Sequence, residues 1–207
     1  MITVDRKIQA GNVIHTYDQV ATYIEKHDAE GVGTCFRRHA ARLRGEDVHG
    51  VPMEVCMWFG RGAEFALERL GGRRLSKKEA RELLDHAEEA GLVHMSRNMS
   101  EDIDFLCNCD RWHCEVVTDV LKHPNPDLIF NSGFGPRIDR CPLGALAMDE
   151  RDLPAADMVR CFGCAVCPSR CPENAIVMEA KPNRPEPPKS VKDLAAKIKS
   201  QPRPLQR

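Results

Sequence analysis

The sequence has few aromatic residues and no long apolar run. Phe, Trp and Tyr make up 5% of its 207 residues, and hydrophobic residues as a whole make up 42%. This composition predicts a modest core, part of which would depend on metal ligation or on a partner surface for its order. No stretch approaches the roughly 18 apolar residues of a membrane span, and the first residues contain no apolar signal segment. We therefore expect a cytoplasmic protein with no membrane span.

The sequence also lacks an excess of charge of either sign and lacks the usual catalytic patterns. Its formal net charge of −1 neither favours nor excludes a charged partner. We find no glycine pattern of the kind that binds nucleotide phosphates, and no arrangement typical of a nucleophile with its general base. These absences argue against an enzyme that acts on its own.

Cysteine, in contrast, is abundant, with ten residues. Disulfides are rare in the reducing cytoplasm, so the spacing of these cysteines predicts metal or redox chemistry. An internal repeat supports this interpretation, because residues 141–148 and 171–178 match at Cys, Pro, Ala and Met. The second copy begins at the last cysteine of the run that bacterial-type ferredoxins use to bind a four-iron cluster, Cys161-x2-Cys164-x2-Cys167-x3-Cys171-Pro172.

This run of cysteines predicts the ligands of one [4Fe-4S] cluster. Two residues between successive cysteines let a tight loop direct its thiolates at three irons, and in the duplicated ferredoxin fold the fourth cysteine of each run ligates the other cluster. Zinc is the other interpretation, because CxxC spacings also suit tetrahedral zinc, but the third cysteine and the Cys-Pro ending favour iron. We therefore predict a cluster held by Cys161, Cys164, Cys167 and Cys141, with Cys171 as the alternative fourth ligand.

The first half of the repeat has lost its binding loop. Asn131, Phe134 and Arg137 occupy the positions where three ligands would be needed. A second cluster would require other thiols, and the candidates are Cys107, Cys109, Cys114 and Cys171. The alternative is an acidic loop whose cysteines are structural, so the sequence predicts one cluster and leaves a second one open.

Several stretches resemble known proteins. Residues 161–178 resemble the bacterial-type dicluster ferredoxins, and residues 141–148 resemble the end of their first half. A longer stretch resembles a family of anaerobe four-iron ferredoxin proteins with a cysteine-bearing helical region ahead of the ferredoxin module. It comprises VPMEVCMWFG at 51–60, EARELLDHAEEAGLVH at 79–94 and Cys-Asn-Cys at 107–109. The resemblance implies electron transfer within a larger redox system of anaerobic metabolism, and it names no substrate.

We expect an α+β fold in four segments. Residues 1–100 would be mostly helical, with the outline of a winged-helix unit at 63–97, and residues 101–139 would form an acidic, cysteine-bearing loop and connector. Residues 140–180 would form the ferredoxin-type four-iron domain of small hairpins, and residues 181–207 a proline-rich linker and a basic helical arm. The helix of the winged-helix unit is too acidic to favour phosphate binding, so we expect no nucleic acid partner.

The expected function is the carriage of single electrons through the [4Fe-4S] cluster. The partner would be a redox protein or a larger oxidoreductase subunit, a flavin-containing one among the candidates. Two alternatives stay open. In the first, the chain is the iron–sulfur subunit of a multisubunit oxidoreductase complex. In the second, it is a redox-sensing regulator.

Three further features have ordinary explanations. Cys35 and Cys56 are too few to hold a cluster alone, and we expect them to pack as buried apolar residues. His113 is expected to be solvated rather than a ligand. The arginine group near Cys35 is expected to form a solvated helix face rather than an anion site, and comprises Arg37, Arg38, Arg42 and Arg44.

Overall fold

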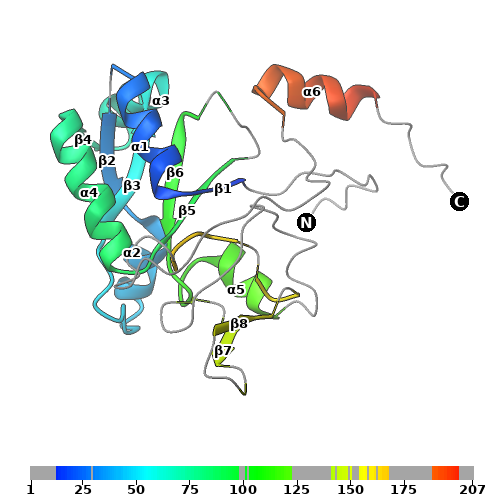
Figure 1. The fold of residues 1–207 in the computed structure, drawn as a ribbon. Helices are drawn as coiled ribbons and strands as arrows, with labels where there is room; N and C mark the ends of the chain where they lie inside the picture. The colour runs from blue at the N-terminus through cyan, green and yellow to red at the C-terminus, as the bar shows by residue number, and fades with distance from the viewer. Residues whose placement is uncertain are drawn as a thin grey trace, which may run out of the picture.

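A six-stranded antiparallel sheet forms the body of the protein in the computed structural model (Figure 1). The structure describes residues 13–28, 30–97, 101, 103–122, 141–142, 144–148, 150, 154–157, 159–161, 163–167 and 188–200. The strand order is β1-β5-β6-β3-β2-β4, so strands that are distant in sequence become neighbours. The strands are β1 (Val13–His15), β2 (Glu30–Thr34), β3 (Glu54–Phe59), β4 (Arg73–Leu75), β5 (Val93–Ser96) and β6 (Phe105–Cys109).

Helices alternate with these strands, and local capping explains where they begin and end. Helix α1 begins at a capping box of Thr16 and Gln19, and α4 begins at a capping box of Ser76 and Glu79. Beyond α4, Gly91 takes a left-handed φ of 69°, which ends a helix at little cost when the residue is glycine. The mixture of helices with an antiparallel sheet confirms the α+β class. The helices are α1 (Tyr17–Lys26), α2 (Phe36–Leu43), α3 (Gly60–Arg69), α4 (Lys77–Glu89), α5 (Glu115–Lys122) and α6 (Val191–Ser200).

Helices α1 and α4 cover one face of the sheet. Side chains alternate between the two faces of a strand, and Val32, Met57 and Leu106 all lie on this covered face. They are almost completely buried, and they form the main apolar core of the protein. The helix residues in this core are Val20, Ile24, Ala80 and Leu84.

The opposite face has two covers. Towards β2 and β3 it carries α3, where Gly31 lies against Ala63. Towards β1, β5 and β6 it carries α5 and the cysteine-bearing C-terminal segment. These parts share one core, made of Ile14, Val93, Met95, Cys109, Val117, Ala145, Cys161, Cys164 and Val166. Three of the cysteines predicted for the cluster, Cys141, Cys161 and Cys164, therefore pack against the sheet.

A small hairpin precedes the cysteine loop. Strands β7 (Leu146–Met148) and β8 (Pro154–Ala156) pair antiparallel, with Leu146 opposite Ala156. The second copy of the sequence repeat, at 171–178, lies outside the described residues. Within the described ranges, no helix has the length and apolar character needed to cross a membrane.

Three expectations about the rest of the chain were wrong. The described part of residues 1–100 is not mostly helical, because five strands alternate with four helices there. The region 63–97 is no winged-helix unit, since β4 and β5 are not neighbours in the sheet. Cys107 and Cys109 lie in strand β6 and Cys114 lies just before helix α5, so the described part of 101–139 is not a single loop. Strand β2 was hard to predict, because glycines such as Gly31 and Gly33 are typical of a break between elements, although both lie in the sheet.

One buried carboxyl group gives a prediction about pH. Glu30 of β2 is 2% exposed, and its Oε1 atom has no hydrogen-bond partner. Burial raises the pKa of Glu30, so the folded protein binds this proton more tightly than the unfolded chain. The stability that the proton provides is complete below the ordinary pKa and is lost as the pH rises through the raised pKa. We expect Glu30→Gln to raise the free energy of unfolding at neutral pH by about 1 kcal/mol.

The measurement is urea unfolding of both proteins at pH 7 and at pH 4. The gain should shrink towards zero at pH 4, because Glu30 is then protonated in both states. An equal gain at the two pH values, or none at pH 7, would contradict this explanation. The exposed Glu64 of α3 provides the control, since Glu64→Gln should change the free energy of unfolding by less than about 0.5 kcal/mol.

Candidate metal centre

Four cysteines of the C-terminal segment lie near one another. Cys161, Cys164 and Cys167 are buried, and Cys141 is partly exposed. Burial raises the pKa of Cys164 well above its usual value, and the neighbouring thiols of Cys141, Cys167 and Cys161 raise it further. The structure therefore brings Cys141, which lies twenty residues before Cys161 in sequence, close to the cysteine loop.

The β7–β8 hairpin closes the gap between Cys141 and Cys161. Each of these cysteines lies five residues from the paired ends of the hairpin. Asp157 then joins the two sides, because its N–H donates to the Ala145 carbonyl and its own carbonyl accepts from the Cys161 N–H, both at 2.8 Å. Its carboxylate also accepts hydrogen bonds from the Val159 and Arg160 amides, at 2.9 and 3.2 Å, which fixes the turn into the loop.

The loop backbone is curled around Cys164. Gly163 and Ala165, on either side of it, have left-handed φ values of 77° and 59°. This conformation is unusual for alanine, and such residues gather at ligand clamps. The Ala145 amide donates a hydrogen bond to the Cys141 sulfur at 3.3 Å. These four cysteines are named the loop site below.

The loop site includes three of the predicted ligands and the predicted fourth. Cys171, the alternative fourth ligand, lies outside the described residues, so the choice between it and Cys141 stays a prediction. Among the residues that the structure describes, no group of three or more His, Cys, Asp or Glu side chains is arranged to hold one metal ion. A four-iron cluster needs a different arrangement, with one thiolate at each of four irons rather than four around one point.

A second group of cysteines lines a cavity of about 170 Å³ between the sheet, α2 and α5. Sequence analysis placed three of these near one another, but it left the other two as isolated packing residues. We name this group the cavity site. Its cysteines are Cys35, Cys56, Cys107, Cys109 and Cys114.

The sheet register brings these cysteines together. Met57 of β3 pairs with Leu106 of β6, so the next pair along the two strands places Cys56 beside Cys107 on the face away from α1 and α4. Cys107 and Cys109 share this face, because they are two residues apart on one strand. The remaining two cysteines lie just before helices, with Cys35 preceding α2 and Cys114 preceding α5.

Hydrogen bonds link the thiols in two sets. The hydrogen bond from the Cys56 thiol lowers the pKa of Cys35 to about 5. Burial would raise this pKa, whereas the backbone amide and the charge of Arg38 lower it further. The thiol of Cys109 bonds to both Cys107 and Cys114. The bond between Cys109 and Cys114 lowers the pKa of Cys114 to about 7. In both sets the thiol that donates, Cys56 or Cys109, has a raised pKa.

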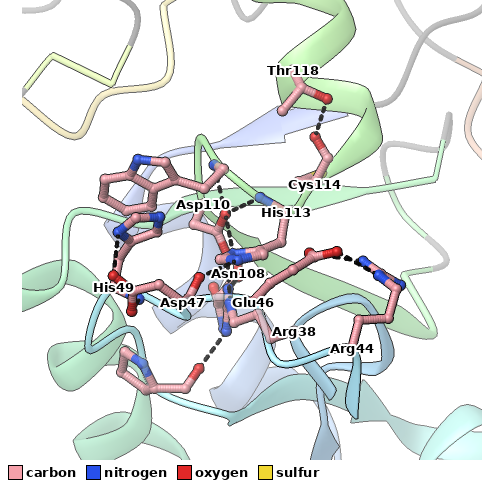
Figure 2. A network of polar contacts seen from close by, with 12 residues as sticks. Arg38, Arg44, Glu46, Asp47, His49, Asn108, Asp110, His113, Cys114 and Thr118 are labelled. Atoms are coloured by element: carbon pink, nitrogen blue, oxygen red, sulfur yellow. Dashed lines mark hydrogen bonds and ion pairs between the residues drawn. The ribbon is translucent and has the colours of Figure 1, made fainter. Parts of the chain in front are cut away.

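A buried arginine connects the segments that carry these cysteines (Figure 2). The Arg38 side chain is 1% exposed, and its Nε donates to the equally buried Asp110 carboxylate at 2.5 Å. Its remaining nitrogens donate to the carbonyls of Asn108, at 2.5 Å, and Pro52. Arg38 thus joins α2 to the entry of β3 and to the end of β6. The expected solvated face was therefore wrong for Arg38, whose charge is matched by buried oxygen acceptors.

Asp110 continues this connection to Cys114. Its carboxylate accepts hydrogen bonds from the Trp112 amide at 2.8 Å and the His113 amide at 2.6 Å. Burial alone would raise the pKa of Asp110, but Arg38 and these amides outweigh burial and hold the pKa below its usual value. Both ring nitrogens of His113 face oxygens, at Asp110 and at the carbonyl of Asp47, so His113 stabilises the turn before Cys114.

Asn108, the polar residue between Cys107 and Cys109, has buried hydrogen-bond partners of its own. Its side chain points to the other face of β6, where its Nδ2 donates to the Val55 carbonyl at 2.7 Å. Its Oδ1 lies 2.5 Å from Nδ1 of the buried His94, whose Nε2 lies 2.9 Å from the buried Glu88 carboxylate. The Cys-Asn-Cys motif therefore directs two thiols into the cavity and one amide into a polar network behind it.

None of the nine described cysteines forms a disulfide. Sequence analysis missed Cys35, Cys56 and Arg38 as parts of a site, because long-range strand pairing and not local spacing brings them together. Comparisons of this chain with models of protein families, with curated proteins and with solved structures find no match.

Proposed function

We propose that this protein carries single electrons through one [4Fe-4S] cluster bound at the loop site. The observation that carries the proposal is the position of Cys141, which the β7–β8 hairpin returns to the three cysteines of the Cys-x2-Cys-x2-Cys loop. Four thiolates are the donor set that such a cluster requires. Soft thiolate ligands also bind zinc, which is why the metal itself has to be measured.

The surroundings of the loop site fit a buried, negatively charged group. Ala145 and Val166 are almost fully buried beside it, and they exclude water. The amide of Ala145 offers a hydrogen bond to the Cys141 sulfur. Hydrogen bonds to the sulfurs and the exclusion of solvent are the factors by which a protein sets the potential of such a centre. When bound, the cluster would take up and release one electron without breaking any bond.

One side of the loop site lies near solvent. Cys141 is partly exposed, and Val159, two residues before Cys161, is 50% exposed. This arrangement supports exchange of electrons with a partner protein that docks on this side. Under this proposal, the partner supplies the reaction chemistry and this chain supplies the electron.

The test is the iron and acid-labile sulfide content of the full chain, purified without oxygen, together with the electron paramagnetic resonance (EPR) spectrum after reduction. The double variant Cys161→Ala, Cys164→Ala should lose about four irons and four sulfides per chain relative to the wild type. The exposed neighbour Val159 gives the control, since Val159→Ala should keep both. Zinc in place of iron, or an unchanged iron content in the double variant, would contradict the proposal.

A further inference from the structure

The cavity site has no part in the loop site, yet it is built from more thiols. Five of the ten cysteines in the chain line it, and they come from α2, β3, β6 and α5 or the residues just before these elements. Its volume of about 170 Å³ is many times the 10–15 Å³ or so that one water needs. The apolar part of its wall includes Met95, Phe105 and Val116. A cavity with this wall suits a compact group that prefers sulfur ligands.

The positions of the thiols suit a group with several metal atoms. The two sets, Cys35 with Cys56 and Cys109 with Cys107 and Cys114, come from different elements around the cavity, because Cys56 and Cys107 are neighbours on β3 and β6 whereas Cys35 and Cys114 precede α2 and α5. The sets are close enough that Cys56 and Cys107 influence each other electrostatically. A polynuclear cluster takes one thiolate at each iron and so accepts ligands from separate elements, whereas a single ion needs all its ligands around one point.

The charge around the cavity favours an anionic occupant. Cys35 and Cys114 each precede an eight-residue helix, so the unpaired amides at the beginning of α2 and α5 lie beside their sulfurs. Arg37, Arg38 and Arg97 line the cavity together with the carboxylates of Asp110 and Glu115, which leaves one positive charge in excess. A cluster with four thiolate ligands carries net negative charge, which these groups would stabilise.

The buried ion pair supports the same conclusion. Placing Arg38 and Asp110 in the interior has a large desolvation cost, and such pairs are often no better for stability than apolar residues. Here the pair and its hydrogen bonds set the relative positions of the segments that carry Cys35, Cys107, Cys109 and Cys114. The role of the Arg38–Asp110 ion pair would then be to hold these ligands in place.

We propose that the cavity site binds a second iron–sulfur cluster, with Cys107, Cys109 and Cys114 as three ligands and the Cys35–Cys56 pair supplying the fourth. Cys171 then has no part in this second site. The two sites would be adjacent, because Cys107, Cys109 and Cys114 pack on the same core as Cys141, Cys161 and Cys164. The protein would thus have two neighbouring clusters, each able to hold an electron.

The test counts iron and sulfide in two matched double variants of the full chain. Cys107→Ala, Cys109→Ala should lose about half of the iron of the wild type and keep the EPR signal of the loop site. Cys161→Ala, Cys164→Ala should lose the other half and keep a different signal. The wild type should show the broadened spectrum of two coupled clusters, and each variant a simple one.

A third variant tests the fourth ligand. Cys35→Ala, Cys56→Ala should lose the iron of the cavity site, or convert it to a form with fewer irons, whereas Cys171→Ala should leave it in place. The proposal is overturned if the wild type and Cys107→Ala, Cys109→Ala contain the same amount of iron, or if the cavity binds zinc. It is also overturned if Cys171→Ala removes this iron. Failure of the loop-site proposal would show separately, as unchanged iron in Cys161→Ala, Cys164→Ala. Circular dichroism checks that each variant is folded.

Discussion

Replacing Arg38 by methionine is expected to lower the free energy of unfolding by about 3–5 kcal/mol. The reason is that the buried Asp110 carboxylate would keep its charge but lose its ion-pair partner, while the carbonyls of Pro52 and Asn108 would lose their donors. The measurement is urea unfolding monitored by circular dichroism. The same variant should lose iron from the cavity site, because Arg38 positions the segments that carry the cysteines.

Arg44 provides a matched control for this prediction. It belongs to the same arginine group, but both partners of its ion pair with Glu46 are at least half exposed, so Arg44→Met should leave the free energy of unfolding nearly unchanged. Combining Arg38→Met with Asp110→Asn should cost less than the sum of the two single changes, since the double variant leaves no uncompensated charge. Equal effects of Arg38→Met and Arg44→Met would contradict the proposed role of the buried pair.

Replacing Cys141 by alanine is expected to remove the loop-site cluster or to convert it to a three-iron form. One iron of the cluster would then lack its thiolate, and that iron is the one most easily lost. Cys171→Ala should leave the cluster intact, because the crossover of the ferredoxin fold gives the fourth position of this cluster to Cys141. The measurement is iron per chain, together with the EPR spectrum of the oxidised protein, in which a three-iron form has its own signal. The opposite result, with the conversion in Cys171→Ala alone, would show that the fourth ligand comes from the loop's own run.

Sequence reasoning succeeded where the information is local. The spacing of Cys161, Cys164 and Cys167 predicts a loop that gathers three thiols, and the duplicated Cys-Pro segment identifies Cys141 as their companion. The structure brings these four together. The β7–β8 hairpin lies between Cys141 and Cys161 and reverses the chain there.

The sheet was harder to predict, because its strands are short and β2 contains two glycines for reasons of packing. A Cβ atom at Gly33 would lie 2.7 Å from the Trp58 ring, and Gly31 lies against Ala63 of α3. Glycine in such positions admits a close neighbour rather than forming a turn. The apolar alternation that identifies a strand was therefore interrupted in β2.

The cavity site was beyond the reach of local patterns for a different reason. Cys35 and Cys56 meet Cys107 only because β2, β3 and β6 are adjacent in the sheet, and that order has no signature in the spacing of the residues. Arg38 looked like one of several surface arginines, and only the structure shows that it enters the interior with Asp110. Long-range pairing decides both features.

The most direct test of the central claim is Mössbauer spectroscopy of the full chain, enriched in the iron isotope that this method detects and purified without oxygen. We predict the signal of irons that share their valence within a four-iron cluster, changing when one electron is added and returning on oxidation. The same signal should be absent from Cys161→Ala, Cys164→Ala, apart from the contribution of the cavity site. A signal from single, isolated irons, or zinc at these cysteines without iron, would contradict the assignment of an electron-carrying cluster to the loop site.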